Sequence, residues 1–293
     1  DFQNDAARLS IAGSGSQHAD ISYQAMQVGL ADADHAIVNL LRFHEARNAM
    51  IFCNTRAAVT RLTTRLANRA FPVVALSGEL SQQERSHALQ AMRDGRARVC
   101  VATDVAARGI DLPNLDLVIH AELPTSAETL LHRSGRTGRA GAKGISALIV
   151  PKAARRRAEG LFRRAKIEAE WVDAPTADAV RARDEDRMMT DPVWQEDISD
   201  RDANLAARLL AGQNPRRIAA AFVQLYMASR TAPEELSDES RGTAAAVPGK
   251  WFALSVGRKN NAEPRWILPL LCRAGGFGKQ DVGAIRIQEA ETF

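Results

Sequence analysis

Val101-Ala-Thr-Asp-Val-Ala-Ala-Arg-Gly-Ile-Asp111 is the stretch that decides the fold, because an apolar run ends inside it and polar residues take over. The apolar run over residues 99–102 predicts a short buried strand. In an open parallel sheet, ligands gather just beyond the carboxyl ends of the strands. We therefore expect a ligand site to include the polar residues and the glycine that follow this strand: Thr103, Asp104, Gly109 and Asp111.

A second stretch, His132-Arg-Ser-Gly-Arg-Thr-Gly-Arg-Ala-Gly141, carries Arg133, Arg136 and Arg139 at three-residue spacing. This spacing puts successive arginines about one helical turn apart, so two or three of them are expected to face one anionic target. A guanidinium group holds phosphate oxygens through two parallel hydrogen bonds, and an inserted arginine stabilises the charge of phosphoryl transfer. The pattern therefore predicts a phosphate site.

Strand-like and helix-like segments alternate along the first half of the chain. Strands are expected at residues 49–53, 72–76, 99–102, 115–120 and 145–150, with an edge strand at 23–29. Between them lie segments with helical periodicity, and Asp32 or Asp34 is available to cap the first helix. Ser81 and Glu84 form a capping-box pattern at the start of another. This alternation predicts an α/β fold with a parallel sheet flanked by helices.

Composition limits the class of protein. Of 293 residues, 45% are apolar and 25% are charged, which is ordinary for a globular protein. The net charge of +4 is too small to indicate nucleic-acid binding by itself. Cys53, Cys100 and Cys272 lack the spacing of metal ligands, so we expect reduced thiols in a cytoplasmic protein and no metal site on this chain. No apolar run approaches 18 residues, so no membrane partner is expected.

The two opening stretches resemble a known family. The segment from Ala102 to Asp111 resembles motif V of the DEAD-box RNA helicases, and the segment from His132 to Arg139 resembles motif VI. Ser134 stands where an aliphatic residue is usual in that family. Two long motifs in the expected order favour this resemblance over a chance cluster of surface charges.

Weaker motif matches support the same family. Asn54-Thr-Arg56 resembles part of motif IV, and Ser77-Gly-Glu-Leu-Ser-Gln-Gln-Glu-Arg85 resembles the family pattern His-Gly-Asp-x-x-Gln-x-x-Arg, from which Ser77 and Glu79 depart. A further departure is Ala121-Glu122, which replaces an aromatic residue and Asp before Leu-Pro. The resemblance covers about residues 20–150 and implies a RecA-like domain.

The resemblance implies roles for individual residues. Arg136 and Arg139 would be catalytic arginine fingers on the γ-phosphate of ATP, with Gly109 and Asp111 also in the ATP-binding set. His132 and Arg133 would couple the ATP site to RNA. The RNA backbone would contact Thr55, Arg56, Gly78, Gln82, Arg85, Thr103 and Asp104.

The sequence lacks a Gly-x-x-x-x-Gly-Lys-[Ser/Thr] nucleotide cradle and an Asp-Glu-Ala-Asp box after an apolar strand. We therefore expect the chain to be the C-terminal half of an ATP-dependent RNA helicase. ATP and Mg²⁺ would be held mainly by an N-terminal RecA-like domain of the same protein. Closure of the two domains would remodel or locally unwind RNA, and the fragment alone would not hydrolyse ATP.

Five regions are expected. Residues 1–170 form the RecA-like domain and 171–197 a linker or exposed helix. Residues 198–230 form a helical hairpin that resembles the dimerisation element of DeaD-type helicases, so a homodimer is possible. Residues 231–250 form a flexible linker, and 251–293 resemble the first half of a DbpA-type RNA-binding domain, an α+β variant of the RRM.

Alternative interpretations stay open at this point. The parent protein could be a DNA-directed superfamily 2 helicase, or the chain could be a non-catalytic module for RNA binding and dimerisation. The basic residues between Lys152 and Lys166 form either a solvated helix face or a stripe that follows phosphates.

Overall fold

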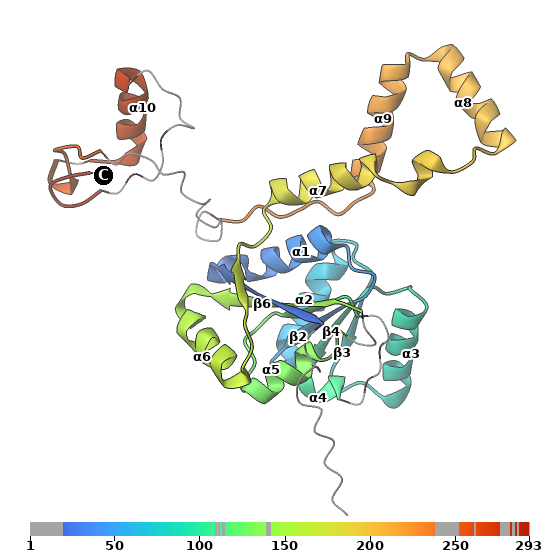
Figure 1. The fold of residues 1–293 in the computed structure, drawn as a ribbon, viewed down its shortest axis with the longest axis horizontal. Helices are drawn as coiled ribbons and strands as arrows, with labels where there is room; N and C mark the ends of the chain where they lie inside the picture. Colours follow the sequence, from blue (N-terminus) through green and yellow to red (C-terminus); the bar gives the residue numbers. More distant parts are fainter. Residues whose placement is uncertain are drawn as a thin grey trace, which may run out of the picture. The chain divides into compact units, whose positions relative to one another are not determined.

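A seven-stranded parallel sheet organises the larger of two compact units, Asp1–Gly242 and Thr243–Phe293 (Figure 1). The computed structural model describes residues 20–108, 110, 112, 115–138, 142–237, 252–260, 262–275, 282, 285 and 287–292. The order of the strands is β3-β4-β2-β5-β6-β1-β7, and every pair is parallel. The predicted RecA-like parallel sheet is confirmed.

The strands are short and mostly buried on both faces, as expected for parallel sheets covered by helices. They are β1 (Ile21–Val28), β2 (Ala49–Cys53), β3 (Val73–Leu76), β4 (Val99–Thr103), β5 (Leu117–His120), β6 (Gly144–Pro151) and β7 (Glu170–Val172). The prediction that β1 is an edge strand is wrong, because β7 pairs with its outer side. The sequence did not predict β7, whose three residues are too few to show a periodic pattern.

Helices cover both faces of the sheet. On one face, α1 (Ala33–His44) and α2 (Arg56–Ala67) bury their apolar residues in a core with β2, β4, β5 and β6. The other face is covered by α3 (Gln82–Arg93), α4 (Asp104–Ala107), α5 (Ala127–Ser134) and α6 (Arg155–Ala165). Successive residues of a strand point to opposite faces, so Met50 joins one core and Ile51 the other.

Predictions for the helix caps had mixed outcomes. The capping box at α3 is confirmed, since the Glu84 N–H donates to Ser81 Oγ at 3.2 Å and the Ser81 N–H donates to Glu84 Oε2 at 2.8 Å. Neither Asp32 nor Asp34 caps α1. Asp34 instead accepts hydrogen bonds from arginines of α2, and Asp32 accepts one from the Ser237 N–H at 3.1 Å. Both carboxylates therefore bond to residues of other segments and leave the start of α1 without a side-chain cap.

The region after β7 is more closely packed than predicted. Residues 171–197 were expected to form a linker or an exposed helix, but β7 occupies their start and α7 (Ala177–Met189) packs on α1. Val180, Asp184 and Met188 of α7 are buried. The sequence did not predict this buried face, because one of its residues is the carboxylate Asp184 and the apolar spacing is therefore interrupted.

Residues 231–237, which we name the strap, lie against α1 and are not the start of a flexible linker. Asn39 of α1 is fully buried, and its amide nitrogen donates to the carbonyl oxygens of Pro175 and Glu234 at 2.8 Å each. Its amide oxygen accepts from the Glu234 N–H at 2.7 Å, and Leu236 of the strap joins the core. These bonds pair both backbone groups of Glu234, and the burial of Leu236 fixes the strap further, so 231–237 do not form a flexible linker. Residues 238–250 lie outside the described part.

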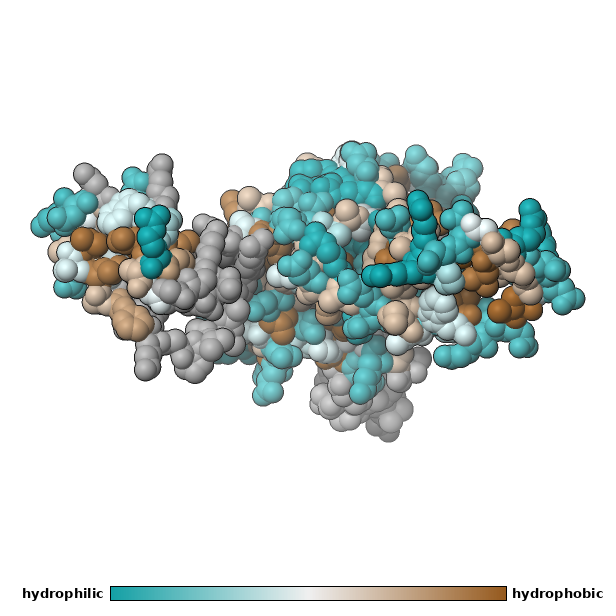
Figure 2. All heavy atoms as spheres, turned by 90° about the horizontal axis from the view of Figure 1, so that it is seen from above, coloured by the Kyte–Doolittle hydropathy of each residue, from teal (hydrophilic) through white to brown (hydrophobic). Residues whose placement is uncertain are grey.

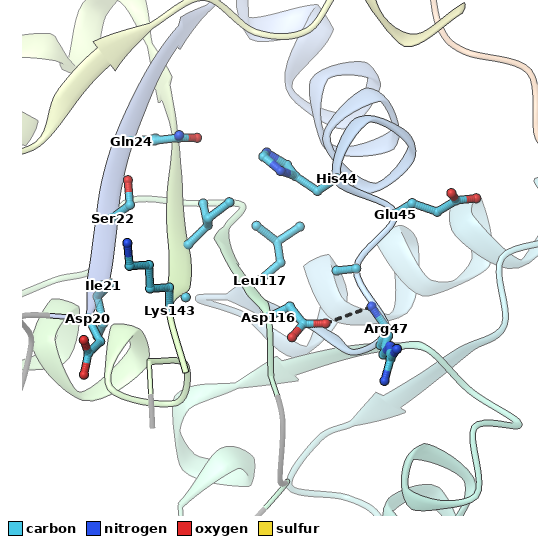
Figure 3. Close-up of a pocket in the computed structure, with 13 residues that line it drawn as sticks. Asp20, Ile21, Ser22, Gln24, His44, Glu45, Arg47, Asp116, Leu117 and Lys143 are labelled. Carbon is cyan, nitrogen blue, oxygen red and sulfur yellow. Dashed lines mark hydrogen bonds between the residues drawn. The ribbon is translucent and has the colours of Figure 1, made fainter. Parts of the chain in front are cut away.

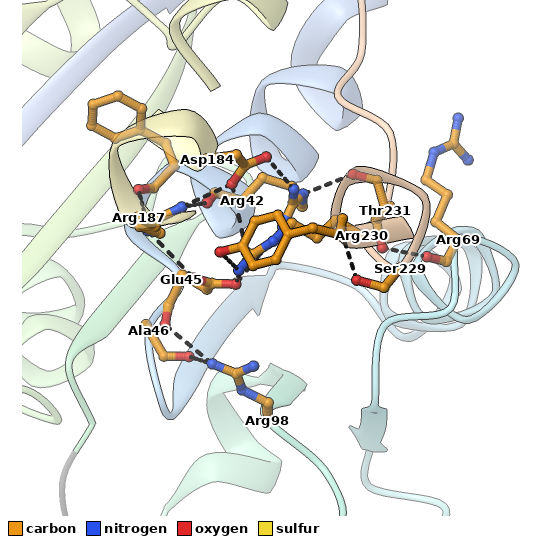
Figure 4. A network of polar contacts seen from close by, with 12 residues as sticks. Arg42, Glu45, Ala46, Arg69, Arg98, Asp184, Arg187, Ser229, Arg230 and Thr231 are labelled. Atoms are coloured by element: carbon orange, nitrogen blue, oxygen red, sulfur yellow. Dashed lines mark hydrogen bonds and ion pairs between the residues drawn. The ribbon is translucent and has the colours of Figure 1, made fainter. Parts of the chain in front are cut away.

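A group of ion pairs, which we name the arginine network, joins α1, α7 and the start of the strap (Figure 4). Arg42 donates to Asp184 at 2.5 Å and to the Thr231 carbonyl at 2.7 Å. The Glu45 carboxylate pairs with Arg230 at 2.5 Å and with Arg187 at 3.3 Å. Burial lowers the pKa of Arg42, although Asp184 opposes that shift. The network therefore binds both ends of the intervening segment, residues 190–229.

That segment contains α8 (Asp200–Gly212) and α9 (Pro215–Ala228), which form the predicted helical hairpin. Side chains cap both helices: Ser199 accepts from the Asp202 N–H at 3.2 Å and Asn214 from the Arg216 N–H at 2.9 Å. Neither helix has a buried residue. The hairpin thus leaves its apolar side chains in solvent.

The smaller unit has one described α-helix, α10 (Pro264–Gly275), and the spacing of Ile267, Leu270 and Leu271 also predicts a helix here. Leu254 and Thr292 form an antiparallel bridge, with N–H to carbonyl distances of 2.8 and 2.9 Å. A side chain at Gly257 would lie 2.5 Å from the Ala290 backbone, so the approach of these segments requires glycine. The sequence Gly283-Ala-Ile-Arg-Ile287 predicts a strand, but these residues lie largely outside the described part of the chain.

Candidate nucleic-acid and phosphate site

Two threonines mark the carboxyl edge of the sheet. Thr55 follows β2 and its side-chain oxygen accepts from the Ala58 N–H at 3.1 Å, so it caps α2. Thr103 ends β4 and accepts from the Ala106 N–H at 3.4 Å. Each hydroxyl keeps its own hydrogen to donate. The adjacent strands β2 and β4 therefore place two hydroxyl groups and two helix starts along one edge.

Charged residues continue this edge beside β3. Arg56 forms an exposed ion pair with Glu79 at 2.7 Å, and a side-chain carbon added to Gly78 would lie 3.3 Å from the Arg56 guanidinium. Arg85 of α3 donates to the Arg108 carbonyl at 2.9 Å, one turn after the exposed Gln82. The predicted RNA residues thus lie along the ends of three neighbouring strands.

Arg133 does not face outward, so it is not among the two or three arginines expected to face one anionic target. Its side chain is 1% exposed and donates to both oxygens of Asp104 at 2.6 and 2.7 Å. It also donates to Asn54 Oδ1 at 2.8 Å and to the Glu122 carbonyl at 3.2 Å, with Phe52 beneath the guanidinium. Arg133 therefore ties together the ends of β2, β4 and β5.

Sequence reasoning missed Asn54 and Glu122 as parts of this site. The Glu122 carboxylate accepts from the Asn54 N–H at 2.6 Å, which fixes the turn after β2 to the turn after β5. Both follow the end of a predicted strand, and that position could have identified them as candidates for the site. The departure to Ala121-Glu122 therefore has a structural role, because Glu122 supplies a carboxylate to the neighbouring turn.

Arg136 lies just past α5 and remains partly exposed. It donates to the Ile110 carbonyl at 2.6 Å, which places its guanidinium beside the loop that follows α4. His132 lies exposed on the last turn of α5. Gly109, Asp111 and Arg139 lie outside the described residues. The turn after Arg136 requires glycine at position 138, because φ is +65° there and an added side-chain carbon would lie 2.5 Å from the Ile21 side chain.

The unusual Ser134 belongs to a buried polar cluster beneath the site. Its hydroxyl lies 2.8 Å from that of Ser146, which lies 3.0 Å from His120 Nε2. Burial and the nearby Arg133 cation hold the pKa of His120 well below its usual range. Ser134 therefore replaces an aliphatic residue where neighbouring strands supply polar partners.

The stability of the larger unit is expected to fall as the pH drops below about 6.5, the ordinary pKa of histidine. Above that pH His120 is neutral in both the folded and the unfolded chain. Below it, the unfolded chain binds a proton that the folded chain excludes, which lowers stability by up to about 1.4 kcal/mol per pH unit until the folded pKa is reached. Urea unfolding between pH 7 and 5.5 measures this slope.

His44 contributes in the same direction, because burial and two arginines lower its pKa as well. The control variant His120→Gln should therefore reduce the slope while leaving the contribution of His44. An unchanged slope in this variant would show that His120 does not exclude a proton.

The described residues contain a hollow of about 650 Å³ at the opposite edge, by the amino ends of β1, β5 and β6 (Figure 3). Its walls carry charges of both signs, including Glu45, Asp116 and Lys143, and the Arg47 N–H donates to Asp116 at 3.0 Å. Such a lining matches neither a phosphate nor a cation. We therefore assign the phosphate site to the carboxyl edge.

The described residues contain no group of three or more His, Cys, Asp or Glu side chains arranged to hold a metal ion. No helix among them has both the length and the apolar character that crossing a membrane requires.

Comparisons with known proteins match both units. The family model described as "Helicase conserved C-terminal domain" matches residues 32–141, and the model described as "DbpA RNA binding domain" matches residues 251–293. An ATP-dependent RNA helicase of Phaeosphaeria nodorum, MAK5, is 40% identical over 163 residues. That match spans 54% of this chain but only 20% of the relative.

Solved structures share the fold of the larger unit. The C-terminal domain of the DEAD-box protein Dbp5 is 30% identical with a TM-score of 0.51, and the match covers 56% of this chain and 96% of that domain. Dbp5 of S. cerevisiae bound to RNA and ADP BeF3 is 28% identical with a TM-score of 0.52, covering 57% of this chain and 45% of that one.

Proposed function

This chain belongs to the DEAD-box RNA helicases and carries their C-terminal RecA-like domain, so we propose that it forms one half of an ATP-dependent RNA helicase. It would bind RNA along the carboxyl edge of its sheet. It would also present arginine to a nucleotide held by an N-terminal RecA-like domain of the same protein. The observation that carries this proposal is the row of hydroxyl, glycine and guanidinium groups at the ends of β2, β3 and β4.

The RNA backbone is the ligand that this edge suits. Thr55 offers a hydroxyl donor at the start of α2, where phosphate binds favourably, and Thr103 offers a second hydroxyl at the end of β4. Arg56 and Arg85 add positive charge, and Gly78 allows close approach. Such contacts recognise phosphates and ribose hydroxyls, so they select RNA by its shape and hardly by its sequence. The RNA in the Dbp5 complex supports this assignment by analogy.

Arg136 is proposed as an arginine finger, together with Arg139. The Ile110 carbonyl positions the Arg136 guanidinium, which carries five N–H donors and can also approach a phosphate. Gly109 and Asp111 remain proposed ATP contacts. ATP and Mg²⁺ would be held mainly by the N-terminal domain, and the ion would neutralise phosphate charge there.

Arg133 and His132 are proposed to couple the two ligands. Arg133 joins the strand ends that carry Thr55 and Thr103 to α5, and Arg136 directly follows that helix. If RNA binding shifts the strand ends that carry Thr55 and Thr103, Arg133 would pass the movement to α5, and Arg136 would move with that helix. Asp104, whose carboxylate binds Arg133, acts in this proposal by positioning. Closure of the two domains would bend one RNA strand and separate a short duplex.

The test is ATP hydrolysis by this chain mixed with, or fused to, the N-terminal RecA-like domain, with and without RNA. RNA-stimulated hydrolysis that appears only when both parts are present would support the proposal. Hydrolysis by the chain alone would contradict it. RNA binding without any hydrolysis in the mixture would favour a non-catalytic RNA-binding module.

We also propose that the hairpin of α8 and α9 pairs with a second copy of the chain. Apolar side chains gather on it in solvent (Figure 2): Leu205, Leu209, Leu210, Phe222, Val223 and Leu225, each 38–72% exposed. Two short helices cannot bury such a surface by themselves. A homodimer would cover it.

The variant Leu209→Asp/Leu225→Asp is therefore expected to sediment as a monomer at concentrations where the wild type is a dimer. The melting temperature should change little, because both side chains are about half exposed or more. Leu30→Asp, at an 82% exposed leucine far along the chain, is the matched control and should stay dimeric. A wild-type chain that is monomeric at all concentrations would contradict the pairing.

A cytoplasmic location is part of the same proposal. Cys53 and Cys100 are free and buried, and burial raises the pKa of each thiol to about 12. Both therefore remain protonated core residues, as expected for a reducing compartment.

A further inference from the structure

Helix α6 and its flanking residues concentrate the positive charge of the chain. Residues 152–166 hold seven cations and one acid, which gives this segment a net charge of +6. Because the whole chain carries +4, the remaining residues together carry −2. The positive balance of the protein therefore comes from one short segment.

The cations point away from the core. Ala158, Leu161 and Phe162 bury one side of α6 against the sheet. All seven cations of the segment are exposed. Within the described residues, the only ion pair of this segment joins Arg155 to Glu159 at 3.0 Å. The other six cations, Lys152, Arg156, Arg157, Arg163, Arg164 and Lys166, thus face solvent with no ion pair to the part of the chain that the structure describes.

The start of α6 is electrostatically unfavourable. Arg155, Arg156 and Arg157 occupy its first turn, no acid accompanies them, and Ala154 at the N-cap provides no side-chain hydrogen bond. The N-terminus of a helix carries partial positive charge, so cations there oppose folding. By contrast, Thr or Ser side chains cap α2, α3, α5 and α7 in the same chain. Features that break folding rules in this way are expected where a ligand supplies the missing charge.

The position of α6 continues the proposed RNA edge. Lys152 directly follows the carboxyl end of β6, and β6 lies two strands from β2 in the sheet. At about 4.8 Å between strands, the line of β6 runs roughly 10 Å from that of β2. An RNA strand that crosses the ends of β3, β4 and β2 and continues along the edge would pass β5 and then reach the end of β6, where the chain leads into α6.

Contacts with the sheet hold this first turn in place. The Arg155 guanidinium stacks on Trp171 of β7 at 4.4 Å and donates to Gln27 of β1 at 2.9 Å. The helix also packs against α5 (Figure 1). The exposed arginines are thus carried on a fixed element, which lowers the entropy lost when they bind a ligand.

We propose that the outer face of α6 is a second binding surface for the sugar-phosphate backbone of RNA, beyond the carboxyl edge. It consists of Arg156, Arg157, Arg163 and Arg164, with a lysine at each end. Guanidinium groups bind phosphate oxygens through two parallel hydrogen bonds, so this surface holds RNA of any sequence. The inference rests on the proposed function, because the strand it receives is the one bound at the edge.

The test uses the full chain and two oligouridylates, one of about 6 nucleotides and one of about 20, since single-strand sites span roughly 4–16 nucleotides. The α6 variant replaces Arg156, Arg157, Arg163 and Arg164 with Gln. The control replaces Arg201, Arg208, Arg216 and Arg217 of the hairpin with Gln, an equal loss of charge. Affinities are measured across a range of salt concentrations.

The α6 variant should bind the long RNA about tenfold more weakly at 0.1 M salt, and its salt slope should fall by up to about 2.8, or 0.7 per lost phosphate contact. Its affinity for the short RNA and the affinities of the control should not change. Its melting temperature should change little, because Arg156 and Arg157 leave the unfavourable first turn while Arg163 and Arg164 leave the last turn, where cations are favourable. A clearly lower one would attribute the lost affinity to an unfolded helix, which contradicts a direct role of these arginines in binding.

Other results overturn the inference in distinguishable ways. Equal losses in both variants, or for both RNA lengths, would show a bulk effect of charge. If the α6 variant keeps its affinity for long RNA but loses binding to phosphatidylserine vesicles, the surface serves an anionic membrane. A wild-type chain that binds neither RNA would overturn the proposed function itself, and this inference with it.

Discussion

Replacing Arg136 with alanine is expected to lower RNA-stimulated ATP hydrolysis about a thousandfold in a protein that contains both RecA-like domains. The guanidinium is held beside the 110–112 loop by its bond to the Ile110 carbonyl, so it is positioned before nucleotide arrives. An arginine inserted at the transferring phosphoryl group stabilises charge that develops only in the transition state. The rate of hydrolysis should therefore fall far more than the affinity for RNA.

Two controls separate this role from a general effect of charge. Arg136→Lys keeps the cation but loses the planar fork, so it should restore only part of the rate. Arg96→Ala removes an exposed arginine that pairs with Asp94 at 3.1 Å on another turn, and it should be harmless. Full activity in Arg136→Ala would refute the finger role and leave Arg139 as the remaining candidate.

Replacing Arg133 with alanine is expected to destabilise the larger unit by about 3 kcal/mol, measured by urea unfolding. Removing one partner of a buried ion pair typically costs about 3–5 kcal/mol, because the other charge is left unpaired. The lower end applies here because the Asp104 side chain is 35% exposed and water can reach it. The substitution also leaves Asn54 and the Glu122 carbonyl without this donor.

The matched comparison for Arg133 is the double variant Arg133→Met/Asp104→Leu. It removes both charges and keeps apolar volume above Phe52, so it should recover part of the lost stability. A loss of less than about 1 kcal/mol in Arg133→Ala would mean that the strand ends hold together without this residue. Its proposed part in coupling would then also fail.

The sheet could be predicted from sequence because parallel strands leave a strong local signal. The residues 49–53 and 99–102 are continuous apolar runs followed by polar residues, and the structure places both inside the sheet, with a neighbouring strand on each side. The same pattern located Thr55 and Thr103 at strand ends. Local chemistry decided these positions, so the sequence alone was sufficient.

The rest depended on partners distant in sequence. The Asp32 carboxylate could have capped α1 by its position, but its partner Ser237 lies 205 residues away. The direction of Arg133 was mispredicted for a similar reason, since helical spacing says nothing about Asn54, 79 residues earlier. Spacing predicts which residues share a helix face, but it cannot predict whether a charged side chain on that face points to solvent or binds a buried partner from another part of the chain.

The arginine network has a consequence for how the protein tolerates change. The chain leaves the RecA-like fold after α7 and returns at Arg230, and Arg187 and Arg230 bind the same Glu45 carboxylate. The hairpin is therefore an insertion in the RecA-like fold, and the two chain segments that lead into and out of it are held together at Glu45. Because its two stems already meet, the entropy of loop closure changes only slowly with the length between them. Residues 190–229 can thus be lengthened, shortened or exchanged without stretching the sheet from which they project.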